Sequence, residues 1–425
     1  MLITRARLAR LGSVATTQVL VQAVGFLAGI LLVRHMAQAE YGYYTLAVSM
    51  VSIAIILSDL GLATAVMAIG GGAASERATL GRLIVDADAV HRRLTWLSLV
   101  VLVPCFAFLL ARQHAPLWQV LVLTFVIVVT AVFTARGGMA LSIARVLGHL
   151  GVQQKLDLAI NIAKLGLLMV AVFVALDATI ACLVNLVAAA VYAHVLRRHL
   201  KQHVDLPPVP AGEHQPALER HVRRQAPNSV YFVLSSQLAL WLIGMFGSAE
   251  RVAEAGALGR LAALFTVITA VSASLVLPYF ARRESAAELA AGFAGVNLFY
   301  GALLVVLVAA GMAMPQPILW VLGGHYAGLH DELIWMLLAS ALTAWGGAIY
   351  TIGCARGWVM PAWLGISTGI VATVSAAALV DVSTVRGSFM INASTGLVGT
   401  VVALGYFSNQ LRRHARGGAP AKATP

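Results

Sequence analysis

Long apolar stretches recur along the whole of this 425-residue chain. Each is close to the roughly 20 residues that an α-helix needs to cross the hydrocarbon core of a bilayer. We identify twelve, at residues 11–33, 44–68, 94–110, 117–133, 156–176, 178–196, 229–246, 257–279, 293–312, 333–352, 361–379 and 389–407. A segment in lipid must satisfy its own backbone hydrogen bonds, so the pattern predicts an all-α polytopic membrane protein with about twelve transmembrane helices.

The composition supports a membrane location. Hydrophobic residues make up 60% of the chain and charged residues only 11%, whereas a soluble domain carries about 25% charged residues. The net charge of +12 is explained by basic cytoplasmic loops, so we expect no nucleic-acid partner. Cys105, Cys182 and Cys354 lie in or beside apolar runs without ligand spacing. We therefore expect them to be packed thiols without a redox role. His149, His325 and His330 show no metal-ligand spacing, and the sequence has no nucleotide-binding glycine loop with a lysine and no Ser/His/Asp set that the spacing can assemble, so we expect no metal site, no cofactor and no catalytic residues.

The distribution of basic residues predicts the orientation. If the N-terminus is cytoplasmic, 23 of the 29 Lys and Arg residues fall on cytoplasmic segments and 5 on the opposite side, and Lys164 lies inside a span. Positive charge gathers on cytoplasmic loops. An even number of spans with both termini in the cytoplasm accounts for this asymmetry.

The longest loop divides the chain into two halves. We predict an N-terminal six-helix lobe at 1–196, a cytoplasmic basic linker at 197–228, a C-terminal six-helix lobe at 229–411 and a disordered cytoplasmic tail at 412–425. Within the linker, the basic segment 219–224 is expected to lie on the membrane surface. No loop is long enough to bury a core of its own. The sequence Ala-Glu-x-Gly follows the first helix of each half, at 39–42 and 253–256.

Ionisable residues inside spans are the first candidates for function, because each is costly in lipid unless it is paired or hydrated. Asp59 and Lys164 are both expected roughly 12–14 Å from the cytoplasmic end of their helices. Asp157, Asn161 and Lys164 follow the helical spacing i, i+4 and i+7, which places them on one stripe. Two interpretations stay open: an Asp59–Lys164 ion pair that joins two helices, or contact with a substrate or a coupling cation.

Five further polar residues are candidates for substrate contact. Arg34 and Arg260 lie near the outer leaflet at comparable places in the two halves, where an arginine fork suits phosphate but also suits anchoring at the headgroups. Arg223 and Arg224 could attract an anionic substrate to the cytoplasmic mouth or only fix topology. Gln237 could line a cavity or hydrogen-bond to a neighbouring helix.

Several short motifs, in order along the chain, resemble those of polysaccharide-type flippases. The resembling segments are 32–44 with its Arg and Tyr-Gly, Ser58-Asp-Leu-Gly-Leu62, Gln225-Ala-Pro-Asn228, 242–280 with Leu277-Pro-Tyr-Phe280, and Val321-Leu-Gly-Gly-His-Tyr326. On these motifs the chain resembles the lipid-linked oligosaccharide flippases of the multidrug/oligosaccharidyl-lipid/polysaccharide exporter superfamily. Residues 236–241 depart from the family pattern, because they lack the acidic residue often found there.

This resemblance implies a function and a location. Such proteins move undecaprenyl-diphosphate-linked oligosaccharide to the periplasmic leaflet of the bacterial inner membrane, for synthesis of O-antigen, exopolysaccharide or other surface polysaccharide. They have two six-helix lobes around a cationic cavity and work by alternating access. The partners implied are the lipid-linked substrate, membrane lipids, and a polysaccharide polymerase and chain-length regulator in the same membrane.

Two alternatives remain. A cation-coupled multidrug exporter of the same superfamily would need an acidic cavity, whereas a diphosphate lipid calls for positive charge. A membrane-embedded polymerase or glycosyltransferase would need a sizeable outer loop with catalytic residues, and the predicted outer loops are short. We therefore expect a carrier and not an enzyme.

Overall fold

The computed structural model describes residues 5–73, 77–147, 149–204, 212–263, 265, 268–269, 280, 283, 285–356, 358 and 360–416. These residues form α-helices and one short 3-10 helix and no strands. The α-helices are α1 (Arg5–His35), α2 (Gln38–Asp59), α3 (Leu62–Ala73), α4 (Arg77–Arg112), α5 (Leu117–Val146), α6 (Leu150–Val174), α7 (Ala178–Lys201), α8 (Gln215–Phe246), α9 (Ala249–Ala262), α11 (Ala286–Ala313), α12 (Pro315–Trp320), α13 (His330–Arg356), α14 (Ala362–Leu379) and α15 (Val385–Ala415).

The predicted fold class is confirmed as an all-α, multi-pass membrane protein. Eleven of the described helices are long and apolar enough to cross a membrane. The remaining predicted span, 257–279, lies mostly outside the described residues, and only its beginning is seen, in α9. Large apolar side chains point outward from the helices, among them Phe173, which is 89% exposed, and Leu379, which is 84% exposed. An exposed apolar surface on spans of this length is consistent with contact with lipid.

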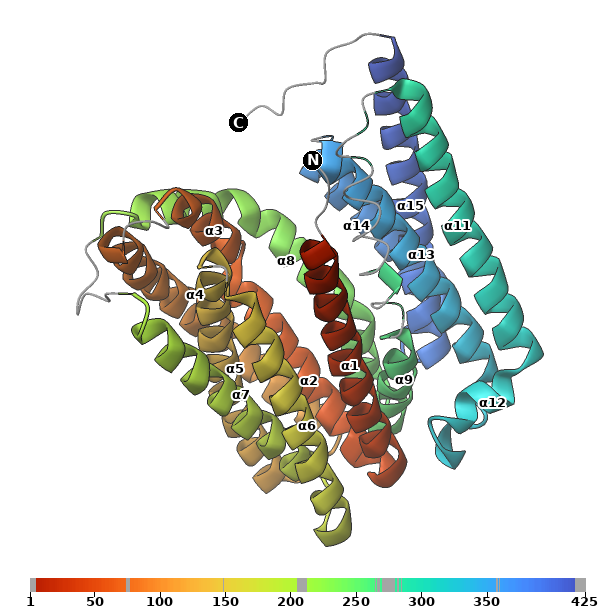
Figure 1. Cartoon of the computed structure of the whole chain (residues 1–425). Helices are drawn as coiled ribbons and strands as arrows, with labels where there is room; N and C mark the ends of the chain where they lie inside the picture. Colours follow the sequence, from red (N-terminus) through yellow and green to blue (C-terminus); the bar gives the residue numbers. More distant parts are fainter. Residues whose placement is uncertain are drawn as a thin grey trace. The chain divides into compact units, whose positions relative to one another are not determined.

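The chain forms two compact units, Met1–Ala253 and Glu254–Pro425. In the N-terminal unit α1 packs along α6, and α5 packs against α2, α4 and α7 (Figure 1). Helix α8 packs against α2, α3 and α4 of the same unit. The predicted division into lobes at 1–196 and 229–411 stays a prediction.

The second predicted span is broken in the structure. Hydropathy predicts one helix over residues 44–68, but α2 ends at Asp59 and α3 begins at Leu62. Leu60 and Gly61 both have left-handed backbone conformations, with φ of 41° and 86°. This conformation is nearly free of strain for glycine and ends a helix. The apolar run therefore contains two helices joined by a sharp turn.

Helices of the N-terminal unit extend well beyond the predicted spans, on the side expected to be cytoplasmic. Helix α4 begins at Arg77, not at residue 94, and α8 begins at Gln215, not at 229. The extensions of α4, α5 and α8 pack with α3 and the end of α7 around a shared apolar core. Its buried residues include Leu62, Val66, Leu83, Ile143, Leu200 and Leu218.

This shared core corrects two sequence-based expectations. No single loop is long enough to bury a core, but several helix extensions together do so. The basic segment 219–224 is part of α8 and not a separate surface helix. Val222 in this segment and Leu218 just before it are buried in the core, while Arg223 and Arg224 are exposed.

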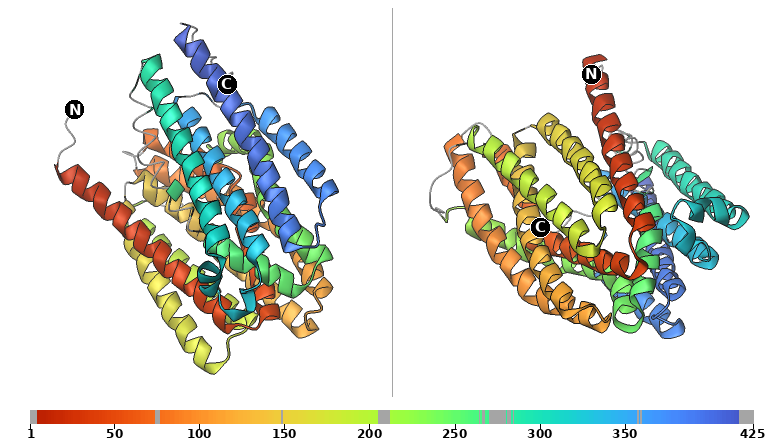
Figure 2. Two further views of the ribbon diagram at one scale, coloured as in Figure 1. Left: turned by 90° about the vertical axis from the view of Figure 1, so that its right-hand side faces the viewer. Right: turned by 90° about the horizontal axis from the view of Figure 1, so that it is seen from below.

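In the C-terminal unit, α13 packs along α15, and α11 and α14 flank this pair (Figure 2). The apolar contacts include Ile349 and Ile352 of α13 with Phe407 of α15. A cross-helix hydrogen bond joins Trp345 Nε1 to Asn297 Oδ1 at 2.7 Å. This polar pair joins two neighbouring helices, α11 and α13.

Candidate substrate site

Asp59 caps a helix. Its two carboxylate oxygens accept hydrogen bonds from the backbone N–H groups of Gly61, at 3.2 Å, and Ala63, at 2.8 Å. These N–H groups open α3 and have no partner within the helix, so an acceptor side chain just before it stabilises the helix start. The break in the second span and the position of Asp59 are thus two parts of one feature.

One of the two interpretations left open, an ion pair between Asp59 and Lys164, is not formed in the structure. The ion pairs among the described residues include neither side chain. The physical reason is the packing of the helices: α6, which carries Lys164, packs along α1 and α7, whereas α2, which ends at Asp59, packs on α4, α5 and α8. Similar depth along two helices does not make them neighbours.

Lys164 and Asn161 lie half-buried in the middle of α6, between residues that are exposed. Asn161 Nδ2 donates to the backbone oxygen of Asp157 at 2.8 Å. Its Oδ1 lies 3.8 Å from the position that a Cβ at Gly25 of α1 would occupy. Asn161 therefore lies on the side of α6 that approaches α1.

Gln237 joins two helices. Its Oε1 accepts a hydrogen bond from Ser49 Oγ of α2 at 2.7 Å. A polar pair between spans removes the cost of leaving either group unpaired in lipid. In this structure Gln237 has the interhelical role, which was one of its two expected roles.

In the N-terminal unit, every carboxylate that the structure describes from Glu40 to Asp177 accepts a hydrogen bond or forms an ion pair. Glu40 accepts hydrogen bonds from Gln119 Nε2, at 2.8 and 2.9 Å, and from the N–H of Ala178, at 2.9 Å. The others and their partners are Asp59 with two N–H groups, Asp86 with the N–H groups of Gly212 and His214, Asp88 with Arg92 and Arg197, Asp157 with Gln153, and Asp177 with the N–H of Ile180.

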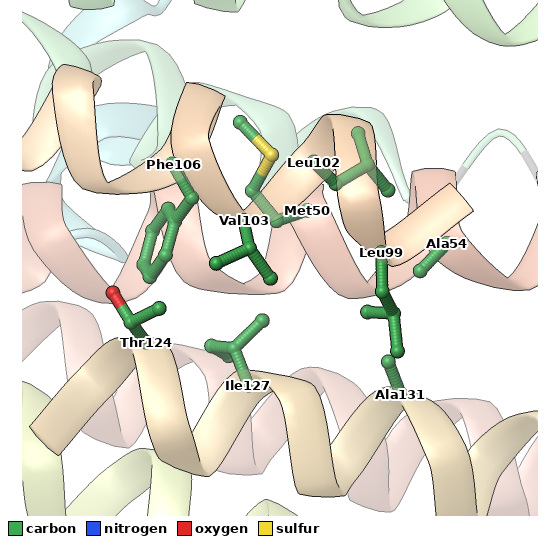
Figure 3. Close-up of a pocket in the computed structure, with 9 residues that line it drawn as sticks. All are labelled: Met50, Ala54, Leu99, Leu102, Val103, Phe106, Thr124, Ile127 and Ala131. Atoms are coloured by element: carbon green, nitrogen blue, oxygen red, sulfur yellow. The ribbon is translucent and has the colours of Figure 1, made fainter. Parts of the chain in front are cut away.

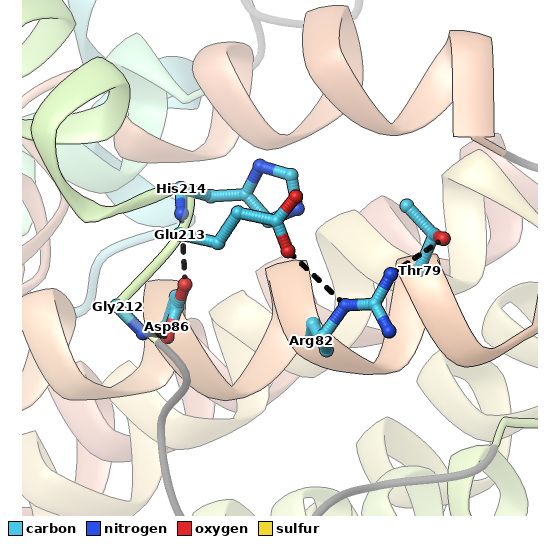
Figure 4. A network of polar contacts seen from close by, with 6 residues as sticks. All are labelled: Thr79, Arg82, Asp86, Gly212, Glu213 and His214. Carbon is cyan, nitrogen blue, oxygen red and sulfur yellow. Dashed lines mark hydrogen bonds and ion pairs between the residues drawn. The ribbon is translucent and has the colours of Figure 1, made fainter.

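A polar network at the expected cytoplasmic end joins α4 to the segment that leads into α8. Asp86 is fully buried, and its two oxygens each accept a backbone N–H at 2.9 Å (Figure 4). Arg82 pairs with Glu213 at 3.2 Å. Further along, Arg93 pairs with Glu219 of α8 at 3.6 Å. These contacts hold the start of α8 against α4.

Two of the family-like motifs meet at this end. A Cβ at Gly61 would lie 2.6 Å from Cγ of Gln225, so glycine is required by both its conformation and its neighbour. Thr64 Oγ1 lies 3.1 Å from Nε2 of His221, also on α8. The Ser58–Leu62 motif and the Gln225–Asn228 motif therefore form one contact between α2, α3 and α8.

The four arginines are distributed over both units. Arg34 is exposed in the last turn of α1, and Arg223 and Arg224 are exposed on α8. Arg260 is half-buried in α9 and belongs to the C-terminal unit. Of the residues proposed from sequence, Asp59, Gln237, Arg223 and Arg224 lie on the packed pair α2 and α8, and Asn161 and Lys164 lie on α6.

A small cavity in the N-terminal unit is not a candidate for a polar substrate. It lies among α2, α4 and α5, and its lining is apolar apart from one threonine (Figure 3): Met50, Ala54, Leu99, Leu102, Val103, Phe106, Thr124, Ile127 and Ala131. A sugar diphosphate would lose its hydration there without gaining polar partners.

Sequence reasoning missed several buried or clustered polar groups. Asp86 and His91 are buried on α4, in a stretch that hydropathy assigns to a loop. His149 has no histidine near it in sequence, but the structure brings it next to His199 and His203. The spacing of His199 and His203, four residues apart, was a readable signal, because it places two imidazoles on one face of a helix.

The fold is shared with solved transporter structures. A structure described as the lipid II flippase MurJ in an inward closed conformation matches with a TM-score of 0.75 and 9% identity, over 95% of this chain and 90% of that chain. An inward-facing multidrug resistance MATE family transporter of the MOP superfamily matches with a TM-score of 0.69 and 15% identity, over 94% and 96%. This chain shares the fold of these transporter structures.

A MATE transporter from Vibrio cholerae also matches, with a TM-score of 0.60 and 14% identity, over 94% of each chain. At these identities the likeness concerns the fold. No family model and no curated protein sequence matches the chain.

Proposed function

We propose that this protein is a flippase that moves undecaprenyl-diphosphate-linked oligosaccharide from the cytoplasmic to the periplasmic leaflet of a bacterial inner membrane, for surface polysaccharide synthesis. The fold is shared with structures of membrane transporters, one of which is described as the lipid II flippase MurJ. Fold alone does not choose among substrates. The choice of an anionic substrate rests on the charge of the polar residues that lie within the membrane-spanning helices.

Lys164 is the observation that carries this proposal. It lies in the middle of a span, and none of the described ion pairs involves it. A lysine at this depth is costly unless an anion or water accompanies it. Because Asp59 is occupied in capping α3, it does not cancel this charge. A diphosphate that enters from the cytoplasm would supply the missing negative charge.

The engaged carboxylates favour an anionic substrate over a cationic one. An exporter of organic cations needs an acidic group that is available in its cavity. The described carboxylates between Glu40 and Asp177 already accept hydrogen bonds or form ion pairs. In the proposed mechanism, Arg223 and Arg224 attract the diphosphate at the cytoplasmic mouth, Asn161 and Lys164 bind it within the membrane, and Arg34 and Arg260 receive it at the outer side.

The test is a deletion strain assayed for the leaflet in which lipid-linked oligosaccharide accumulates. The wild-type gene should restore surface polysaccharide, Lys164→Gln should restore little, and Lys164→Arg should restore more than Lys164→Gln because it keeps the charge. Lys155→Gln is the matched control, since Lys155 is exposed on the same helix.

Accumulation in the cytoplasmic leaflet of the deletion strain supports flipping. Normal polysaccharide together with raised sensitivity to cationic dyes would contradict the proposal and favour a multidrug exporter. Equal complementation by Lys164→Gln and Lys155→Gln, at equal protein level, would show that Lys164 does not bind the substrate.

A further inference from the structure

We propose that His149, His199 and His203 bind a divalent transition-metal ion at the expected cytoplasmic end of the N-terminal unit. His149 directly precedes α6, His199 lies in the last turn of α7, and His203 follows the end of α7. One ring nitrogen from each of the three lies within 4.8 Å of the other two. The site therefore joins the start of one span to the end of the next.

The three rings form a close group. The centroids of His149 and His199 are 5.0 Å apart, those of His149 and His203 are 4.7 Å apart, and those of His199 and His203 are 4.4 Å apart. All three side chains are half-buried, so they are held by the protein and remain accessible to an ion.

The hydrogen bonds prepare the rings for a metal. His203 Nδ1 lies 2.8 Å from the backbone oxygen of His199, and only a protonated Nδ1 can donate to that oxygen. This bond leaves the lone pair of His203 Nε2 available, in the manner of the outer-shell contacts that orient metal-binding histidines. His199 Nε2 and His149 Nδ1 face each other at 3.0 Å. A metal ion between them would take the place of the shared proton.

The donor set selects the class of ion. Neutral imidazoles suit zinc, copper, nickel and cobalt, whereas magnesium and calcium prefer oxygen ligands. Metal–nitrogen bonds of about 2.0–2.1 Å place two nitrogens of a tetrahedral site about 3.3 Å apart. The pair His149 Nδ1 and His199 Nε2, at 3.0 Å, already has nearly this spacing, and nitrogens as far apart as 4.8 Å would have to approach by up to about 1.5 Å. Three histidines leave a fourth position for water or a small anion.

The surroundings agree with a cation. The site lies at the C-terminal end of α7, where the helix dipole favours positive charge. Lys201 lies two residues from both His199 and His203, and therefore points to the opposite side of the helix. A bound ion would fix the beginning of α6 relative to α7. This inference does not depend on which substrate the protein carries.

The test uses the full-length protein, purified in detergent with a tag that contains no histidine and stripped of metal with a chelator. Calorimetric titration with Zn²⁺ should give one ion per chain. Titration with Co²⁺ should give the visible absorption of a nitrogen-coordinated, tetrahedral ion. Affinity should fall at lower pH, because protons compete for the same nitrogens.

Each of His149→Ala, His199→Ala and His203→Ala should weaken binding by about a hundredfold, at least as much as loss of an outer-shell partner does. His194→Ala is the matched control, because His194 is exposed on the same helix and outside the cluster. Unchanged binding in all three variants would overturn the proposal, as would a wild-type protein that binds no Zn²⁺ or gives no tetrahedral Co²⁺ spectrum. The metal-free thermal stability of each variant checks that it is folded.

Discussion

Replacement of Asp59 distinguishes a helix cap from one half of a buried ion pair. Loss of a capping side chain costs about 0.5–2 kcal/mol, whereas removal of one partner from a buried ion pair costs about 3–5 kcal/mol. For a domain of roughly 150–250 residues, 1 kcal/mol corresponds to about 2–4 °C in the unfolding midpoint. Asp59→Ala should therefore lower the midpoint of the purified protein by a few degrees, since it removes the acceptor for the N–H groups of Gly61 and Ala63.

The variant Asp59→Asn sharpens this test. Asparagine caps a helix about as well as aspartate does, so Asp59→Asn should stay close to wild type in a thermal unfolding assay monitored by tryptophan fluorescence. An ion pair would be broken by asparagine and alanine alike. The effects of Asp59→Ala and Lys164→Ala should also add to within about 0.5 kcal/mol, because the two residues have no common partner. If Lys164→Ala restored the stability of Asp59→Ala, the capping account would be refuted.

Three destabilising substitutions and one control test the packing of the N-terminal unit by the same thermal assay. Gly42→Ala should lower the free energy of unfolding by about 1–3 kcal/mol, because its Cβ would collide with the backbone oxygen of Ala249. Gly138→Ala is the control. It has open space around it, so it should leave the free energy of unfolding unchanged or raise it by up to about 1 kcal/mol. Gln237→Leu should cost about 0.6–1.7 kcal/mol, the range for a hydrogen bond between spans. Glu40→Ala should cost about 1–3 kcal/mol, because it leaves buried donors unpaired. A wild-type midpoint in any of the three destabilised variants would contradict the contact concerned.

The sequence was sufficient for the number and approximate position of the spans, because hydropathy over about 20 residues is a local property. It did not reveal the break after Asp59, since hydropathy averaged over residues 44–68 does not register a break of two residues. The Asp-Leu-Gly sequence contained the signal, because a capping aspartate and a glycine at positive φ are what a helix break requires. Hydropathy also underestimated α4 and α8, whose extensions are stabilised by packing against one another and against neighbouring helices.

Which polar side chains meet depends on which helices are neighbours more than on how deep each residue lies in the membrane. Asp59 and Lys164 were predicted to pair because they lie at similar depths along two helices. The sequence around each residue does not show which helices are neighbours. Gln237 and its partner Ser49 are separated by 188 positions in the chain. The same limit applies to His149, which is 50 positions from His199. Only the spacing of His199 and His203 could be read directly as one face of a helix.

The most direct test of the proposed function is transport by the purified protein in sealed vesicles. Undecaprenyl diphosphate that carries a labelled oligosaccharide is placed in both leaflets, and its exposure to an impermeant sugar-modifying enzyme is followed in time. The wild-type protein should make the protected fraction accessible, Lys164→Gln should do so much more slowly, and the vesicles should not take up an organic cation such as ethidium. Uptake of the cation without exchange of the lipid-linked sugar would contradict the proposed function.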